Sequence, residues 1–554
     1  MLKKLELLYG REAMALEAEI HQLIKSYKAR IGSENLARPL SEKDSILITY
    51  ADSLHRGNEK TLKVLNDFLA AYVKETFSGV HLLPFYPYSS DDGFSVIDYC
   101  KVKEDFGEWS DLEAMGESYD LMFDAVINHI SQHSAWYEGF KEGDPAYKDF
   151  FTVSDPTLDY SQVVRPRALP LLTPVMIEGE KKHVWTTFSE DQIDLNYANP
   201  KVFLKVLEVL FEYVCHGAKL IRLDAIGFAW KTVGTTCIHL PETHSLIQLM
   251  REALQEVKED VVIITETNVP HKENVSYFGD GHNEAHMVYQ FPLPPLTLYA
   301  LLTGDGSKLT EWADSLEPLT NETTFFNFLA SHDGVGLRPV EGMLDKTQVQ
   351  VMVDAAIRNG GRINYKNNSD GTKSPYEMNI NYMDGLRLEG DTDDLHCKRF
   401  LAAQSILYSM IGVPGVYIHS LLGSGNDLEG MTSSGINRRI NREKLDYDLL
   451  ATALSEEPRR KVIFETNKHL LAIRSGEKAF NPFGRQVVLK LETGVFALER
   501  YSVDDGSKVL VLINLLSDPL RVEKRVKGID LITCKRYDTQ NLLLKPYEVL
   551  WIKE

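Results

Sequence analysis

Cysteine is scarce in this chain, and the spacing of the cysteines does not indicate disulfide pairs. The 554 residues include five cysteines, which are odd in number and far apart, with no C-x-x-C pair or Cys/His cluster. This pattern excludes the usual framework of a disulfide-rich secreted domain and of a zinc site. We therefore expect the chain to work in a reducing cytoplasm.

Long apolar runs and an excess of basic residues are also missing. No stretch is apolar for long enough to span a bilayer, and the opening "MLKKLELLYGREAMALEAEI" lacks the apolar core of a signal peptide. The formal net charge of −20 argues against nucleic acid or an anionic membrane as a partner, because either would require a basic face. A hydrophobic content of 44% with 25% charged residues is typical of a globular protein.

Eight short apolar runs of strand type recur along the chain, separated by longer helical patterns such as 199–217 and 243–257. The runs are ILITY (46–50), GVHLLPF (79–85), LMFDAVIN (121–128), LIRLD (220–224), VVIITE (261–266), HMVYQF (286–291), TFFNFLA (324–330) and GVYIHS (415–420). Apolar strands that alternate with helices indicate a parallel sheet covered on both faces, and eight such strands close a barrel. The predicted fold class is therefore α/β, a (β/α)8 TIM barrel.

Other segments do not fit the alternation of strands and helices. Residues 1–44 read as a helical N-terminal extension. Two long intervals, about 135–200 and about 338–393, predict subdomains inserted into a barrel domain that we place at 45–480. The later pattern of short alternating strands, as in "RQVVLKLETGVFALERY", predicts a C-terminal β-sandwich domain over 481–554.

Polar residues stand at the ends of four of the eight runs. They are Asp124, Asn128 and His129 after the third, Arg222 and Asp224 at the fourth, Glu266 at the fifth, and His332 with Asp333 after the seventh. The carboxyl ends of barrel strands form one rim, where active sites lie. An isolated Arg-x-Asp would be read as a structural ion pair, but four polar strand ends on one rim indicate a site.

Three carboxylates in one pocket suit the transfer of a sugar. One attacks the anomeric carbon, a second protonates the leaving oxygen, and others hold hydroxyl groups. We expect Arg222 to keep Asp224 ionised for the attack, and the apolar strand before Glu266 to keep that residue protonated as the acid.

Four blocks carry a family resemblance: DAVINH (124–129), IRLDAIGF (221–228), IITETN (263–268) and ASHD (330–333). In order, they resemble the signature regions of the α-amylase-type glycoside hydrolases and transglycosylases, and the pattern covers the chain from about residue 46 to the tail. The resemblance implies Asp224 as nucleophile, Glu266 as general acid/base and Asp333 as transition-state stabiliser, with His129, His332 and Arg222 as partners of the sugar and the nucleophile. Some amylases bind calcium near Asn128, but no dense carboxylate loop indicates a metal site here.

Further segments resemble sucrose phosphorylases. PYSSDDGFSVIDY (87–99) is similar to the closed end of a one-glucose pocket, RPRALP (165–170) and SPYEMN (374–379) to loops that reach phosphate, and NRRINR (437–442) to a glucose-contacting segment. The resemblance implies Asp91, Phe94, Phe188, Gln192 and Arg438 beside the sugar, and Arg167 and Tyr376 beside phosphate. A guanidinium suits that role because it binds the dianion through two parallel hydrogen bonds.

Departures from the sucrose phosphorylases indicate a narrower group. Asn268, Phe228 and Glu377 replace residues frequent in those enzymes, and ITETNVPHKEN and EAHMVYQF look much closer to the glucosylglycerate phosphorylases. That family splits 2-O-α-glucosylglycerate with phosphate into α-glucose 1-phosphate and glycerate, with retention. The resemblance implies inorganic phosphate as co-substrate and no organic cofactor. We expect Arg167 to contact both anions, with a contribution from His271 or Lys272.

Sucrose phosphorylase, sucrose 6′-phosphate phosphorylase and a hydrolase stay open as alternatives, because the loops around the acceptor decide among them. A different class, the non-catalytic amylase-like scaffold, is disfavoured because all three acids are present. The expected partners are a small sugar substrate and phosphate, with no nucleic acid and no membrane, and the expected assembly is a monomer or a homodimer.

Overall fold

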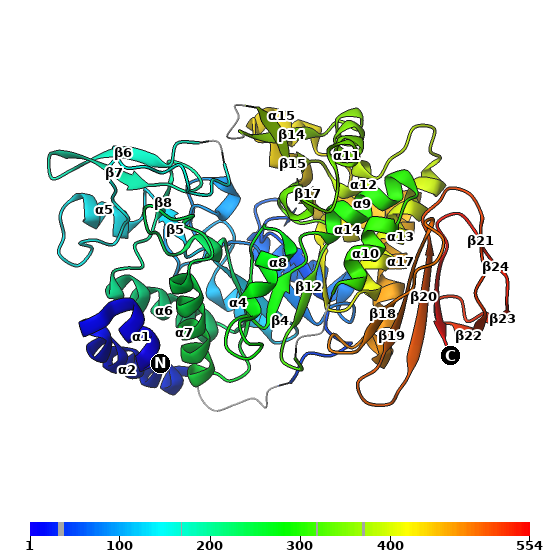
Figure 1. Cartoon of the computed structure of the whole chain (residues 1–554), viewed down its shortest axis with the longest axis horizontal. Coiled ribbons are helices and arrows are strands. Elements are labelled where there is room, and N and C mark those ends of the chain that lie inside the picture. The colour runs from blue at the N-terminus through cyan, green and yellow to red at the C-terminus, as the bar shows by residue number, and fades with distance from the viewer. Residues whose placement is uncertain (32–37, 168, 317–319, 368–371) are drawn as a thin grey trace.

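A closed, all-parallel barrel forms the centre of the protein (Figure 1). The computed structural model describes residues 1–31, 38–167, 169–316, 320–367 and 372–554. In chain order the barrel strands are β1 (Ile46–Thr49), β3 (Gly79–Leu82), β4 (Asp120–Ala125), β9 (Ala218–Leu223), β10 (Val262–Thr265), β11 (Met287–Tyr289), β12 (Thr324–Asn327) and β16 (Val413–Tyr417). Each strand pairs with the next in parallel, and β16 closes onto β1. All eight predicted runs are barrel strands, which confirms the predicted fold class.

The helices that cover the barrel follow the predicted patterns. Helix α6 (Pro200–Cys215) and helix α7 (Pro241–Val257) each start with proline in the first turn, where the missing N–H is not needed. Asn199 caps α6, because its side-chain oxygen accepts a hydrogen bond from the Lys201 N–H at 3.0 Å. Their apolar faces are buried, so sequence periodicity and packing agree.

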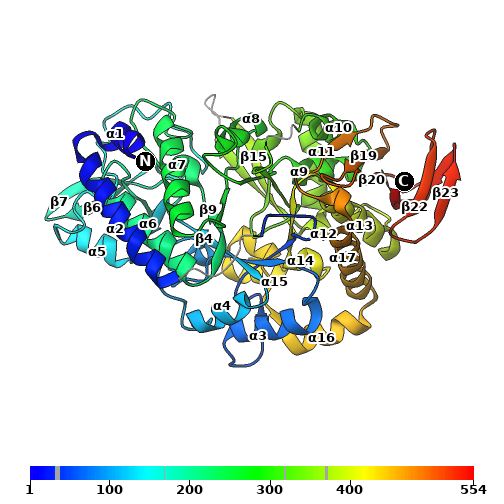
Figure 2. The same ribbon diagram turned by 90° about the horizontal axis from the view of Figure 1, so that it is seen from below.

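The N-terminal segment forms two helices rather than one continuous element. α1 (Leu2–Tyr9) ends at Gly10, whose φ of 54° turns the chain, and α2 (Ala13–Ile31) follows. Helix α2 is described as far as Ile31, and the described residues 38–44 are not helical, so the predicted helical extension does not reach residue 44. Figure 2 shows α1 and α2 beside α6 and α7, and α2 packs on both.

Both long insertions add antiparallel strands on one side of the barrel (Figure 1). The first holds α5 (Ala135–Lys141), β6 (Leu172–Ile177), β7 (Glu180–Trp185) and β8 (Gln192–Asp194). The second holds α11 (Lys346–Arg358), β14 (Arg362–Asn367), β15 (Lys373–Asn379) and α12 (Tyr382–Gly385). Strand β8 pairs with β5 (His129–Ser131) directly after β4, which ties the first insertion to the barrel rim. The domain boundaries given above stay predictions.

The C-terminal segment is an antiparallel β structure. Its six-stranded sheet has the order β18 (Gln486–Val488), β19 (Val495–Tyr501), β20 (Lys508–Asn514), β25 (Val549–Lys553), β22 (Val526–Asp530) and β23 (Arg536–Thr539). A second pair, β21 (Leu520–Val522) with β24 (Leu542–Leu544), covers it, and side chains such as Leu510, Leu512 and Leu544 fill the space between. This arrangement is the predicted β-sandwich.

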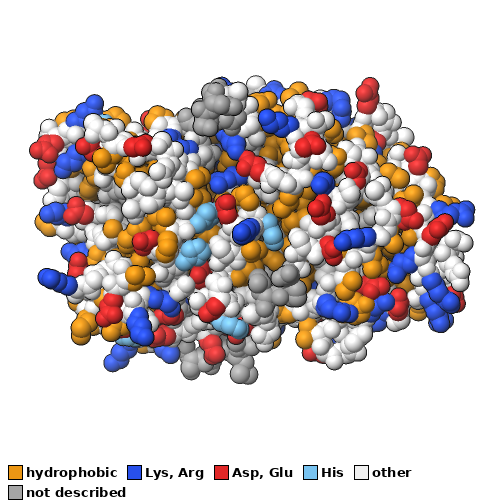
Figure 3. Space-filling view, in the orientation of Figure 1, with side chains coloured by type: hydrophobic (Ala, Val, Ile, Leu, Met, Phe, Trp, Pro, Cys, Tyr) orange, Lys and Arg blue, Asp and Glu red, His pale blue; other side chains and the backbone are white. Residues whose placement is uncertain are grey.

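Two surface properties bear on the partners. No helix in the described part of the chain is long and apolar enough to cross a membrane. Figure 3 shows basic and acidic side chains interspersed over one face, with histidines grouped near its middle. That face therefore presents no broad area of one charge.

Candidate active site

A cavity of about 800 Å³, counted to its open mouth, lies at the carboxyl ends of the barrel strands. Every predicted site residue except Arg222 lines it. The twelve that do so are Asp91, Phe94, His129, Arg167, Phe188, Gln192, Asp224, Glu266, His332, Asp333, Tyr376 and Arg438. Arg222 is buried and donates to Asp224, which lines the cavity. The structure thus brings together residues that the sequence spreads over almost 350 positions.

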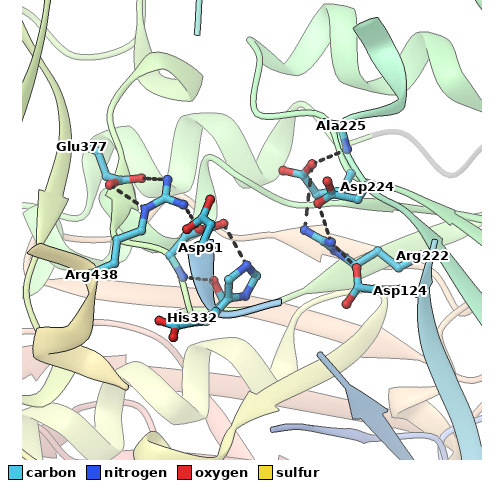
Figure 4. A network of polar contacts seen from close by, with 12 residues as sticks. Asp91, Asp124, Arg222, Asp224, Ala225, His332, Glu377 and Arg438 are labelled. Carbon is cyan, nitrogen blue, oxygen red and sulfur yellow. Dashed lines mark hydrogen bonds and ion pairs between the residues drawn. The ribbon is translucent and has the colours of Figure 1, made fainter. Parts of the chain in front are cut away.

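Arg222 is the hub of the first polar cluster (Figure 4). Its guanidinium donates to Asp124 and, at 2.8 Å, to Asp224 Oδ1, while Glu266 Oε2 lies 3.9 Å away. His81 Nε2 lies 2.8 Å from the second oxygen of Asp124. One buried guanidinium is therefore shared among three carboxylates.

The backbone between Asp224 and Glu266 holds both side chains in place. Ala225 has left-handed dihedrals, φ 46° and ψ 28°, which are costly for a residue with a Cβ. In this conformation its N–H donates to Glu266 Oε2 at 2.9 Å. The Glu266 N–H in turn donates to the Leu223 carbonyl at 3.1 Å, so the ends of β9 and β10 are joined at the site.

Asp224 and Glu266 both ionise less readily than ordinary carboxyl groups. Burial raises the pKa of Asp224 to about 8, although Arg222 acts to lower it, and the nearby Glu266 carboxyl adds to the rise. Burial and the Asp333 charge likewise raise the pKa of Glu266. Arg222 acts to lower the pKa of Asp224, as expected, but burial outweighs this effect. Arg222 also serves Asp124, whose pKa is lowered by this arginine and His81 despite its burial.

Asp333 is in the opposite electrostatic state. Its Oδ1 lies 2.6 Å from Arg438 Nη1 and 3.9 Å from Arg442 Nη2. Although burial acts to raise the pKa of Asp333, Arg438, His332 and Arg442 together hold it well below its usual range. Burial lowers the pKa of His332 to about 3, so its imidazole is neutral near pH 7. Asp333 is therefore a permanently charged carboxylate facing a pair that can hold a proton.

Arg438 is itself anchored by a buried acid. Glu377 accepts from Arg438 Nη2 at 2.7 Å and from Nε at 3.2 Å, a two-point contact (Figure 4). Asn364 Nδ2 adds a third hydrogen bond to Glu377 at 3.2 Å. Arg438 lines the cavity, as expected for a sugar-contacting residue, but its donors are largely engaged by protein carboxylates.

The closed end of the cavity is formed by a strained turn. Asp91 and Asp92 both have positive φ, 52° and 51°, and Gly93 follows with φ 113°. A side chain at Gly93 would meet the Pro84 carbonyl at 2.6 Å, so glycine is required there. Arg442 donates to Asp92 at 2.7 Å, and Arg439 also pairs with this acid. These contacts fix the turn that presents Asp91 to the cavity.

Aromatic and amide groups form the remaining wall around Phe94. The Phe94 ring stacks on His332 with centroids 4.5 Å apart. Its carbonyl accepts from His129 Nε2 and from Gln192 Nε2, both at 2.9 Å. Phe188 lies against His129, with centroids 5.3 Å apart. The insertion that carries Phe188 and Gln192 therefore completes a pocket begun by the barrel.

Arg167 and Tyr376, one from each insertion, also line the cavity. Arg167 Nη2 donates to Asp91 at 3.0 Å, and its guanidinium lies over the Phe188 ring. Burial raises the pKa of Tyr376 to about 12, so the phenol keeps its proton near neutral pH. Arg338, which no sequence pattern pointed to, also lines the cavity.

His271 and Lys272 do not belong to the site. Neither lines the cavity, since His271 lies against Trp312 and Phe325 and Lys272 is exposed. The expectation that one of them contributes to anion binding is wrong, because helix α8 (His271–Asn274) supplies no residue to the cavity, whereas Asn268 and Val269 before it line it.

A buried lysine occupies the polar cluster next to Asn128. Lys231 Nζ lies 2.8 Å from Asp194 Oδ2 and donates to Asn128 Oδ1 at 3.0 Å. Asp194 also accepts from the Thr187 N–H at 2.9 Å. The chain supplies its own cation at this point, and the described residues contain no group of three or more His, Cys, Asp or Glu suited to a metal ion.

Comparison with known proteins agrees with this geometry at the level of class. The sequence profile described as "Alpha amylase, catalytic domain" matches residues 50–339. A crystal structure of sucrose 6F-phosphate phosphorylase from Thermoanaerobacter thermosaccharolyticum superposes with a TM-score of 0.75 at 26% identity, covering 87% of this chain and 96% of that one. The fold and its rim of carboxylates thus define a protein of the α-amylase class.

Relatives of similar length narrow this class. The chain is 46% identical to the glucosylglycerate phosphorylase of Allomeiothermus silvanus, covering 100% of this chain and 98% of the relative. It is 44% identical to that of Escherichia coli (strain K12), covering 95% and 94%. The chain belongs to the glucosylglycerate phosphorylase family.

Proposed function

We propose that this protein is a retaining glycoside phosphorylase that transfers the glucosyl unit of 2-O-α-glucosylglycerate to phosphate. The products are α-D-glucose 1-phosphate and glycerate. The observation that carries the proposal is the set of three cavity carboxylates in two electrostatic states, on a chain similar over its whole length to glucosylglycerate phosphorylases. A hydrolase would need only water, whereas this cavity is lined by arginines that suit anions.

The first step breaks the glycosidic bond. Arg222 lies 2.8 Å from Asp224 but 3.9 Å from Glu266, so it stabilises negative charge better on Asp224. The proton that the pair shares then resides on Glu266. Asp224 attacks the anomeric carbon, Glu266 gives its proton to the glycerate oxygen, and a covalent glucosyl–Asp224 ester forms.

The second step restores both side chains. Glycerate leaves, phosphate enters, and Glu266, now a carboxylate, removes the phosphate proton as a phosphate oxygen attacks the anomeric carbon. The Asp224 ester breaks and α-glucose 1-phosphate leaves. Two inversions give net retention. Asp333, charged throughout, stabilises the positive character of the sugar in both transition states.

The remaining site residues divide between the two halves of the cavity in this proposal. Those around the closed end, namely Asp91, Phe94, His129, Phe188, Gln192, His332 and Arg438, bind glucose. Arg167 and Tyr376, which the two insertions bring to the cavity, bind phosphate. Phosphate is a dianion near neutral pH, and a guanidinium offsets its repulsion by the three acids.

Location and assembly are part of the same proposal. All five cysteines are free, and two of them, Cys100 and Cys534, are exposed, which suits a reducing compartment such as the cytoplasm. The proposed assembly is a monomer or a homodimer, with a sugar and phosphate as small-molecule partners.

The test is release of glucose 1-phosphate from glucosylglycerate and from sucrose, each with phosphate, in parallel. Rapid release from glucosylglycerate alone is the expected result. A preference for sucrose would leave the proposed mechanism intact but contradict the assignment of glycerate as the acceptor. Free glucose from either sugar, without glucose 1-phosphate, would mean that the protein is a hydrolase.

A further inference from the structure

Three arginines line the cavity, and they differ in how far protein carboxylates already engage them. Arg438 contacts Asp333 at 2.6 Å and Glu377 at 2.7 Å. Arg167 donates to Asp91 at 3.0 Å. Arg338 donates no hydrogen bond to any described residue, and the nearest acid, Glu273, is 3.9 Å away. Arg338 is therefore the cavity cation with the most capacity for a ligand.

The surroundings of Arg338 restrict where it can act. It begins a short helix, η6 (Arg338–Val340), directly after β13 (Val335–Gly336). The Leu337 N–H donates to the Tyr376 carbonyl at 2.9 Å, and β13 pairs with β15. The backbone thus fixes Arg338 to the segment that carries Tyr376. With its side chain 16% exposed, Arg338 is largely buried yet open to the cavity.

The same wall includes residues that follow Glu266. A Cβ at Gly336 would lie 3.0 Å from the Asn268 side chain, so β13 packs directly on Asn268. Asn268 Oδ1 is a buried acceptor with no hydrogen-bond partner among the described residues. Because Glu266 protonates the departing oxygen, the leaving group emerges beside this wall. An acceptor amide and a free guanidinium are adjacent to its path.

Resting on the proposed function, we propose that Arg338 binds the carboxylate of glycerate and so selects an acidic acceptor, while Arg167 serves phosphate. Glycerate has a carboxylate and a primary hydroxyl on either side of the oxygen that carries glucose. Arg338 pairs with the carboxylate, and the free Asn268 oxygen accepts from the hydroxyl. This division replaces the earlier expectation that Arg167 contacts both anions in turn.

Glu273 sets the strength of this contact. It is 44% exposed, 3.9 Å from Arg338 and 3.2 Å from His239 Nε2, so it partly offsets the arginine charge without occupying its donors. A glycerate carboxylate would compete with it for the same guanidinium. Glu273→Gln is therefore expected to lower the KM for glycerate two- to fivefold, in keeping with one weak ion pair.

The experiment compares acceptors in the synthetic direction, with α-glucose 1-phosphate as donor and either glycerate or glycerol as acceptor. Glycerol has a hydroxymethyl group where glycerate has its carboxylate. The readout is the ratio of kcat/KM for the two acceptors in the wild type, Arg338→Ala and Arg338→Lys. Arg165→Ala is the matched control, since it removes the same charge from an exposed side chain outside the cavity.

We expect Arg338→Ala to reduce the preference for glycerate by about 10- to 150-fold, the range of a charge-assisted hydrogen bond. The preference of Arg338→Lys should lie between those of the wild type and Arg338→Ala, and that of Arg165→Ala should match the wild type. Phosphorolysis of α-glucosyl fluoride, which involves phosphate but no glycerate, checks the division of roles. Its KM for phosphate should change less than threefold in Arg338→Ala.

Two results would overturn the inference while leaving the proposed function intact. One is an unchanged acceptor ratio in Arg338→Ala. The other is an equal loss for phosphate in the fluoride reaction, which would make Arg338 a general anion contact. A wild-type protein that transfers glucose to fructose and ignores glycerate would instead overturn the proposed function together with the inference.

Discussion

The two arginine clusters that face each other across the cavity hold their acids in opposite states. Arg222 is shared by Asp124, Asp224 and Glu266, and the pKa values of the last two are raised. Among the described residues, Asp333 shares Arg438 with Glu377 alone and has a second arginine, Arg442, further off, and its pKa is lowered. The Asp333 side chain is also more exposed, at 26%, than those of Asp224 and Glu266, at 11% and 12%. Exposure and the number of cations per carboxylate together decide which group keeps a proton.

This difference matches the division of labour in the proposed mechanism. Asp224 and Glu266 share a single guanidinium, so the two carboxyl groups retain one proton between them. Acid catalysis on the leaving oxygen requires that proton. A carboxylate with a surplus of positive charge remains ionised at every working pH, as stabilisation of a cationic sugar requires. The predictions below break or sharpen this contrast, from the largest expected effect to the smallest.

Replacing the attacking carboxylate should have the largest effect. Asp224→Asn keeps the shape but cannot form the glucosyl ester, so glucose 1-phosphate release should fall by about 10⁴-fold or more. The measurement is the initial rate with glucosylglycerate and phosphate. Asp105→Asn, at an exposed position, is the control and should match the wild type. Turnover by Asp224→Asn within tenfold of the wild type would show that another group attacks.

Removing the proton donor should reduce activity less than removing the nucleophile, and the size of the reduction should depend on the leaving group. Glu266→Gln should lower kcat/KM for glucosylglycerate by about 10²- to 10⁴-fold, because the leaving oxygen is no longer protonated. With α-glucosyl fluoride, whose leaving group needs little protonation, the loss should be at least tenfold smaller. Equal losses with both donors would contradict the assignment of Glu266 as the acid.

The pH profile should show the shared proton directly. Since the pKa of Glu266 is raised, its proton is retained to a higher pH than in an ordinary carboxyl, and wild-type kcat/KM should fall only as pH rises through that value. In Glu266→Gln this alkaline limb should disappear, because glutamine has no proton to lose. The acid limb, set by protonation of Asp224, should remain. An alkaline limb that survives in Glu266→Gln would belong to another group.

Weakening the cluster of Arg438 and Asp333 should have the smallest effect on rate. It should change the acid limb of the pH profile. Arg438→Met removes the closest cation from Asp333, so the pKa of Asp333 should rise. Activity at low pH should then be lost earlier, and kcat at neutral pH should fall by about 10- to 100-fold. Measuring kcat from pH 4 to 8 checks this. Arg165→Ala, as a control for charge loss, should leave the profile unchanged.

Much of this site was readable from the sequence because its residues stand at strand ends. Asp224, Glu266 and Asp333 follow strands whose apolar runs were unmistakable, and the barrel geometry then requires them to meet. Asp91, Arg167 and Tyr376 lie in loops, and only their resemblance to known phosphorylase segments identified them. Their place in one cavity could not be derived from periodicity, because loop paths are not periodic.

What the sequence could not show are contacts between distant positions. Arg439 pairs with Asp92 across 347 residues, and Lys231 contacts Asp194 in strand β8 of the first insertion. Arg338 stands in "GLRPV", which directly follows none of the eight apolar runs and matches none of the segments that carried the resemblance. The raised pKa of Asp224 was missed for a related reason, since the Arg-x-Asp pattern shows neither the burial of Asp224 nor the other two acids that share the guanidinium.

The most direct test of the account is the fate of the anomeric carbon when the wild-type protein acts on α-glucosylglycerate in phosphate buffer, followed by proton and phosphorus NMR. The account predicts that α-glucose 1-phosphate and glycerate appear in equal amounts from the first turnover. Formation of β-glucose 1-phosphate would contradict a covalent intermediate on Asp224. Formation of free glucose in place of the phosphate ester would contradict phosphorolysis itself.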